Sequence, residues 1–226
     1  MGNVLGQILA PAIGVALSPL PIVAVILMLF TRQARTNSLA FLLGWILGLA
    51  VVGGIVLVLV NAGRLSLGAS TESTFSAILK LVLGVLLLFG ALRQWQNRPK
   101  EGEEARMPKW MAAIDSFTAG RALGLAALLS GVNPKNLALN LVAATTIAGA
   151  GLATSQQVIA LIVFIVLASV SIAAPVLYYL IAGASAEKTL NGWKAWLIAN
   201  NGAVMAVLFL IFGVKLIGDG IGVLFG

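Results

Sequence analysis

The stretch Ser130-Gly131-Val132-Asn133-Pro134-Lys135-Asn136 interrupts an otherwise apolar run from about Ala122 to Ala150. The run is longer than the roughly 20 residues that cross a bilayer. It nevertheless contains a helix breaker, two amides and a full positive charge. An ionisable residue at membrane depth is costly and is by default a functional-site hypothesis. The sequence therefore predicts a broken membrane helix with a site at the break.

The residues of this stretch also predict where the helix breaks. Asn133 is a favoured N-cap, and Pro134 suits the first helical position, where a missing N–H costs nothing. The helix is thus predicted to end near Gly131 and to begin again at Pro134. Its second half would point unpaired N–H groups and a positive dipole end toward the membrane interior, where an anion would bind.

A similar break is predicted in the first apolar run. In Leu17-Ser18-Pro19-Leu20-Pro21, Ser18 is the candidate cap and Pro19 takes the first helical position. Two Pro-broken membrane helices at corresponding places in two halves of a chain indicate the midplane site of a transporter.

The composition is that of a multi-pass membrane protein. Of the 226 residues 60% are hydrophobic and 9% charged, and the mean hydropathy is +1.06. No soluble class fits these values. The formal charge of +7 suggests a basic surface facing anionic lipid rather than nucleic acid. The absence of Cys and His removes disulfides, thiolate sites and the commonest metal ligand.

Six apolar runs are predicted to form transmembrane helices, and basic residues mark alternate connections between them. The positive-inside rule then places both termini outside a bacterial inner membrane. Three helices per half predict two inverted repeats, residues 1–95 and 121–226, joined by a cytoplasmic connection over 96–120. The N-terminus lacks a basic signal-peptide region, so its apolar run is expected to remain as a helix. The predicted runs are Val4–Phe30, Ser38–Val60, Phe75–Leu92, Arg121–Ala148, Ser155–Ala182 and Leu197–Val223.

Two further patterns concern packing and the membrane interface. The stretch Pro108–Phe117 places Trp110, Met111, Ile114 and Phe117 on one face, which predicts a short helix in the cytoplasmic interface. Gly44 and Gly48 have the spacing that lets membrane helices approach closely, either within the bundle or at a homodimer seam.

The polar residues near the two breaks form the candidate substrate site, and Asn133, Asn136 and Asn140 share one helix face. No carboxylate lies at membrane depth, whereas a cation and two helix N-termini suit a phosphate, sulfate or carboxylate group. The alternative for Lys135 is a structural charge, satisfied by backbone carbonyls or by snorkelling to an aqueous funnel. The candidate site residues are Ser18, Pro19, Pro21, Asn133, Pro134, Lys135, Asn136 and Asn140.

Catalytic and cofactor chemistry find no support in the sequence. There is no nucleophile–base pair, metal-ligand cluster or phosphate-binding loop. We therefore expect neither an enzyme nor a metal or cofactor site, and no nucleic-acid partner.

The chain resembles the sulfolipid-addressing (Sap, also called GAP) family of the lysine-exporter (LysE) transporter superfamily. The resemblance implies two inverted three-helix repeats and a role in moving envelope glycolipid or its precursors outward. The Cys pairs of thiol-redox relatives and the membrane acids of cation-transporting relatives are absent here. The stretches that carry the resemblance are Leu17–Ile22, Phe41–Trp45, Pro108–Met111, Gly120–Gly124, Val132–Asn136 and Gly213–Gly218.

These patterns favour a flippase-like exporter of an amphipathic, anionic lipid or glycolipid precursor. Membrane lipids and this substrate are then the expected partners, with a homodimer as a further option. Two alternatives stay open, a non-transporting scaffold of a lipid synthesis or export complex and an exporter of a small amino-acid-like solute.

Overall fold

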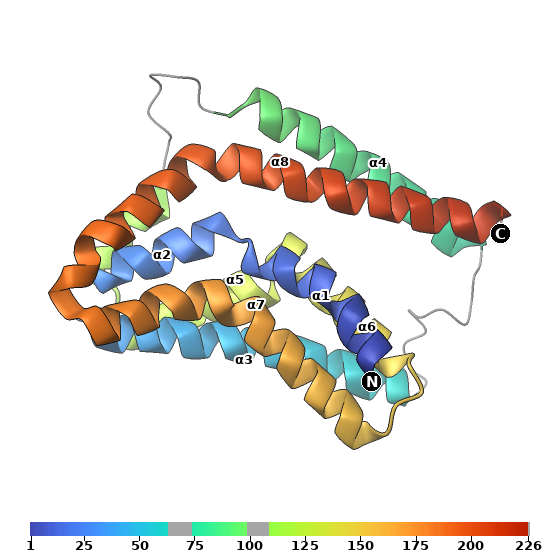
Figure 1. Ribbon diagram of the computed structural model, residues 1–226, viewed down its shortest axis with the longest axis horizontal. Helices are drawn as coiled ribbons and strands as arrows, with labels where there is room; N and C mark the ends of the chain where they lie inside the picture. Colours follow the sequence, from blue (N-terminus) through green and yellow to red (C-terminus); the bar gives the residue numbers. More distant parts are fainter. Residues whose placement is uncertain (63–73, 99–108, 226) are drawn as a thin grey trace. The chain divides into compact units, whose positions relative to one another are not determined.

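The computed structural model describes residues 1–62, 74–98 and 109–225, and within these ranges it consists of helices and short connections without strands (Figure 1). The long helices coincide with the predicted apolar runs. In chain order the helices are α1 Gly2–Ala16, α2 Pro19–Leu29, α3 Ala34–Asn61, α4 Thr74–Gln96, η1 Lys109–Ser116, α5 Ala119–Gly131, α6 Pro134–Ala148, α7 Thr154–Ala182, η2 Gly183–Ala186 and α8 Glu187–Phe225.

Three of the described helices, α3, α7 and α8, are long and apolar enough to cross a membrane alone. The pair α1 and α2 becomes a fourth candidate span if counted as one segment, bent by 55° at the break. The sequence predicted six spans, and crossings by α4 and by the pair α5 and α6 stay predictions, as do the inverted repeats.

The chain divides into two compact units, and each draws on both halves of the sequence. The first unit comprises Met1–Leu67 and Met107–Ala195, and the second comprises Gly68–Arg106 and Trp196–Gly226. The first therefore holds α1, α2, α3, α5, α6 and α7, while the second holds α4 and most of α8. The division into repeats at 1–95 and 121–226 is a separate prediction about sequence symmetry.

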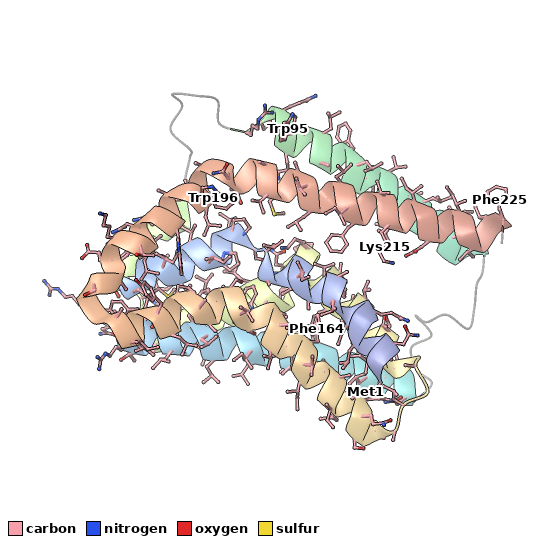
Figure 2. All side chains as sticks on the ribbon, in the orientation of Figure 1. Met1, Trp95, Phe164, Trp196, Lys215 and Phe225 are labelled. Atoms are coloured by element: carbon pink, nitrogen blue, oxygen red, sulfur yellow. The ribbon has the colours of Figure 1, made fainter. Side chains whose placement is uncertain are left out.

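The core of the first unit is packed around the two broken helices. The α1 helix packs against α6 and α7, and α3 packs against α5, α6 and α7. Fully buried side chains include Ile8 and Val15 of α1 and Phe164 of α7, which is labelled in Figure 2. The buried residues of α1 and of α7 recur mainly at spacings of three and four, so each helix buries one apolar face, and this packing holds the first break inside the unit.

Gly44 and Gly48 bring α3 close to α5 of the same chain. A Cβ on Gly44 would lie 2.8 Å from the carbonyl carbon of Leu123, and one on Gly48 would lie 2.7 Å from the carbonyl oxygen of Ala127. These distances leave no space for a side chain. Of the two interpretations of this spacing, packing within the bundle is therefore the one that the structure supports.

The second unit joins α4 and α8 by the same means. A Cβ on Gly84 would lie 2.9 Å from the carbonyl oxygen of Gly213, and one on Gly213 would lie 3.0 Å from that of Gly84. Further along, a Cβ on Gly220 would lie 3.0 Å from the Ala77 carbonyl oxygen. Glycine thus sets the backbone separation of this helix pair.

The predicted interfacial helix is a 3-10 helix, η1, that packs against α2. Ile114 is 1% exposed, so this residue faces protein rather than the interface. The side chains of Trp110 and Met111 lie outside the described residues, and the interfacial location of this segment stays a prediction.

Gly44→Ala is expected to destabilise the protein because the new methyl group meets the α5 backbone. The cost should be at least about 1–3 kcal/mol, the usual penalty of overpacking. Gly54→Ala on the same helix is the matched control, since a Cβ there has nothing within 4 Å. Thermal unfolding of the detergent-solubilised variants measures both, and equal midpoints would show that the two helices can separate without cost.

Candidate functional site

The first helix break lies between Ala16 and Pro19. The α1 helix ends at Ala16, and α2 begins at Pro19 after a 55° bend. Proline cannot continue an existing helix but starts a new one readily, which explains the position of the break. Ser18 is only 4% exposed, and Pro19 and Pro21 are buried as well.

The second break confirms the prediction made from Asn133 and Pro134. The α5 helix ends at Gly131, and α6 begins at Pro134. The side-chain oxygen of Asn133 accepts a hydrogen bond of 3.1 Å from the Lys135 backbone N–H. Asn133 therefore caps α6 as its residue type predicts.

Lys135 connects the two breaks. Its Nζ donates a hydrogen bond of 2.9 Å to the Gly14 carbonyl oxygen and one of 3.0 Å to the Leu17 carbonyl oxygen. A third bond, of 2.7 Å, goes to Ser18 Oγ. Lysine has three N–H donors on its ammonium group, and all three are used. The cation lies at the negative, C-terminal end of the α1 dipole.

The remaining carbonyls at the end of α1 also have side-chain donors. Ser18 Oγ donates to the Val15 carbonyl oxygen at 2.7 Å. Ser171 of α7 donates to the Ala16 carbonyl oxygen at 2.6 Å. The last carbonyls of a helix have no partner within that helix, and an apolar surrounding offers them no water. Side chains of α6 and α7 therefore stabilise the broken end of α1.

Asn136 joins this network from the next position of α6 and is 1% exposed. Its Nδ2 donates to the Leu129 carbonyl oxygen of α5 at 2.9 Å, which satisfies a carbonyl at the second broken end. Its Oδ1 lies 3.2 Å from Ser18 Oγ. The first turn of α6 thus supplies donors to the ends of both α1 and α5.

The predicted capping role of Ser18 is wrong. Ser18 occupies the N-cap position of α2, but its side chain makes no capping hydrogen bond there. The hydroxyl instead points back to α1 and across to Asn136. The carbonyls of the broken α1 end need donors, whereas Pro19 and Pro21 leave the first turn of α2 with few N–H groups to cap.

Asn140 lies on the same face of α6 as Asn136 but belongs to a different contact. Its Nδ2 donates to the Leu49 carbonyl oxygen of α3 at 3.0 Å, and the residue is fully buried. A Cβ on Gly53 would lie 3.1 Å from Asn140 Oδ1. We call the contacts that Lys135, Ser18, Asn136 and Ser171 make with the ends of α1 and α5 the junction. Asn140 instead fixes α6 on α3 and is not a part of the junction.

Ser171 is the junction residue that the candidate site omits. It is one of several polar side chains in the fifth apolar run, and the sequence alone does not pair it with α1. The Gly14 and Leu17 carbonyls are backbone groups and leave no signal in residue type. The breaks themselves are the sequence signal that such carbonyls need partners.

The chain matches the family model described as Sap, sulfolipid-1-addressing protein, over residues 8–222. The chain belongs to this family. The match covers both helix breaks and most of α8, and it indicates a role for this Sap-family protein in lipid export or addressing. Neither the comparison with curated proteins nor that with solved structures gives a match.

The junction of this Sap-family protein offers one cation and several polar groups. Across residues 1–62, 74–98 and 109–225, no three His, Cys, Asp or Glu residues come together to hold a metal ion. Lys135 is partly exposed, and its partner Leu17 is 44% exposed. The junction thus has a buried side at Ser18 and an open side at Leu17.

Lys135→Met should lower the stability of this Sap-family protein because it leaves the Gly14 and Leu17 carbonyls without donors. A hydrogen bond to a charged group contributes roughly 1.5–3 kcal/mol, and the loss should be of at least that size. The midpoint of thermal unfolding in detergent measures it. Ser18→Ala removes a member of the same network, so the double variant should lose less than the sum of the single losses. Strict additivity would contradict the network.

Proposed function

We propose that this Sap-family protein is a flippase-like exporter that moves an amphipathic lipid with an anionic headgroup across the inner membrane, with both termini outside. It acts as a carrier rather than an enzyme. The observation that carries the proposal is the partly exposed Lys135 ammonium at the meeting point of two broken helices. The family match to a sulfolipid-addressing protein supports a sulfated or otherwise anionic glycolipid, or its precursor, as the substrate.

A headgroup can reach Lys135 from the open side of the junction. Leu17 is 44% exposed, whereas Ser18 is 4% exposed, so the bond to the Leu17 carbonyl is the accessible one. An anionic oxygen accepts a hydrogen bond as a carbonyl does, and its negative charge adds a direct attraction to the ammonium group. Exchange of Leu17 for a headgroup oxygen would leave Lys135 with three partners throughout.

Binding of the headgroup would also weaken a contact between α6 and α1. The Leu17 carbonyl would lose its donor while the headgroup is bound, which weakens the tie between α6 and the end of α1. The two ends would then be free to change their bend, and the lipid tails could stay in the bilayer. A movement of one repeat against the other is the form of transport that inverted repeats and membership of the LysE superfamily would imply.

The test is a flipping assay in proteoliposomes with two fluorescent probes. NBD-labelled sulfatide carries a sulfated sugar, and NBD-labelled galactosylceramide lacks only the sulfate. Dithionite bleaches probe in the outer leaflet, so the rate of further bleaching measures flipping. We expect the wild type to flip the sulfatide probe and Lys135→Met to reduce its rate by about tenfold or more, the effect of losing one charge-assisted bond.

Two variants separate transport from stability and from total charge. Ser171→Ala weakens the same helix end without removing the cation and should retain sulfatide flipping. Lys194→Met also removes one positive charge, but its Nζ lies 5.4 Å from the centre of the Phe30 ring and not at the junction. This variant should therefore retain sulfatide flipping as well. Equal flipping of both probes by wild type and Lys135→Met would exclude the proposed headgroup site.

The three saturated donors of Lys135 favour a second candidate, a membrane scaffold that transports nothing. In that case Lys135 only holds the two broken helices together. The scaffold predicts no flipping of either probe by a correctly folded wild type. Native mass spectrometry would then find the same retained lipids on wild type and on Lys135→Met.

A further inference from the structure

The oxygen atoms around Lys135 Nζ all act as acceptors. The Gly14 and Leu17 carbonyls can only accept. The Ser18 hydroxyl accepts from Nζ, and its own hydrogen is directed to Val15 or Asn136. Three oxygen atoms at 2.7–3.0 Å match the three N–H donors of an ammonium group, so the geometry suits a charged Lys135.

These oxygen atoms are of the kind that binds free monovalent cations in other membrane proteins. Backbone carbonyls at unwound segments and at the C-terminal ends of half-helices coordinate Na⁺ in transporters, and rings of carbonyls replace the hydration shell of K⁺ in channels. Here one carbonyl of the last turn of α1, the carbonyl of the following residue Leu17 and one hydroxyl surround the Lys135 nitrogen. The negative end of the α1 dipole adds to their attraction for a cation.

One of the three oxygen atoms, Ser18 Oγ, and the backbone next to Leu17 have contacts with groups other than Lys135. Ser171 binds the Ala16 carbonyl between them, at 2.6 Å. The backbone N–H of Ser18 donates to the same carbonyl at 2.9 Å. Ser18 Oγ donates its one hydrogen to the Val15 carbonyl at 2.7 Å or to Asn136 Oδ1 at 3.2 Å. Ser18 Oγ and the Ala16 carbonyl should therefore keep their positions when the lysine side chain is removed, and Gly14 keeps its place within the last turn of α1.

We infer that the Gly14 carbonyl, the Leu17 carbonyl and Ser18 Oγ form a monovalent-cation cage, which the chain fills with its own tethered cation, the Lys135 ammonium. The junction of the wild type then needs no free Na⁺ or K⁺. A variant without the ammonium leaves the cage to a free cation of similar size, with NH₄⁺ the best substitute because it donates hydrogen bonds as Nζ does. The cage occupies the same junction as the proposed transport site but does not depend on transport.

The experiment is thermal unfolding of Lys135→Ala in detergent at constant ionic strength. The salts are the chlorides of NH₄⁺, K⁺ and Na⁺, with N-methyl-D-glucamine chloride as the reference because this cation is too large for the cage. Lys135 is partly exposed, so its removal leaves a path from the surface to the three oxygen atoms. We expect a saturable rise in the unfolding midpoint with NH₄⁺, a smaller one with K⁺ or Na⁺, and none in the wild type.

Three controls define the cage. Lys135→Arg retains a tethered cation and should not respond to the salts. Lys135→Ala combined with Ser18→Ala lacks one of the three oxygen atoms and should lose most of the response. Ser171→Ala with Lys135 intact should be less stable than the wild type but indifferent to the salt. The same midpoint for Lys135→Ala in all four salts, or a Na⁺- or K⁺-dependent midpoint in the wild type, would overturn the inference.

A second variant keeps the test decisive should Lys135→Ala lose its fold. The chain has no cysteine, so Lys135→Cys carries a unique thiol. Labelling in membranes with 2-aminoethyl methanethiosulfonate attaches an ammonium on an arm one atom longer than that of lysine, and methyl methanethiosulfonate attaches a neutral cap. We expect the aminoethyl adduct to restore the unfolding midpoint and the neutral adduct not to do so.

Equal midpoints for the two adducts would contradict a tethered cation. Because this readout is stability and not flipping, it separates the two hypotheses. A salt response without sulfatide flipping leaves the cage and removes the transport proposal. Sulfatide flipping without a salt response removes the cage and leaves the transport proposal.

Discussion

The contact between the Lys135 ammonium and the end of α1 is the interaction on which the first unit depends. A helix that ends inside an apolar bundle leaves carbonyls without partners, and each unsatisfied group costs free energy that water cannot recover. Lys135 supplies donors to Gly14, Leu17 and Ser18 from a segment 117 to 121 residues away in sequence. The ammonium group thereby gives hydrogen bonds to the unpaired carbonyls of the break. These carbonyls in turn replace the water that the ammonium group loses on burial.

The first turn of α6, at one helix break, provides hydrogen-bond donors for the carbonyls at the ends of both α1 and α5. Asn133 caps the start of α6, and that cap positions the first turn from which Lys135 reaches α1 and Asn136 reaches α5. Close packing of α3 on α5 at Gly44 and Gly48 fixes the position of α5, and with it the position of its C-terminal end, along α3. The junction is thus a consequence of helix capping and glycine packing together. A lipid headgroup that competes for Lys135 would act on the contact that holds these elements in register.

Much of the local structure could be predicted from residue types. The helix break at Pro134, the cap at Asn133 and the restart at Pro19 follow from the fixed φ of proline and the short side chain of asparagine. The partners of Lys135 could not be predicted in this way. The positive end of α6 was expected to receive an external anion, whereas the structure turns the lysine of that same turn onto the carbonyls of α1. Residue type gives the number of donors of Lys135, but not the backbone atoms that will receive them.

The sequence by itself determined an all-helical membrane protein, its family and the positions of two helix breaks, because hydropathy, proline and capping residues act locally. Only the tertiary structure decided that the two breaks meet, that Ser18 faces α1 instead of capping α2, and that Asn140 binds Leu49 on α3. It also decided that Ser171 belongs to the junction. The physical reason is that unsatisfied carbonyls at a broken helix end carry no mark in the sequence, and their partners are set by the packing that brings distant helices together.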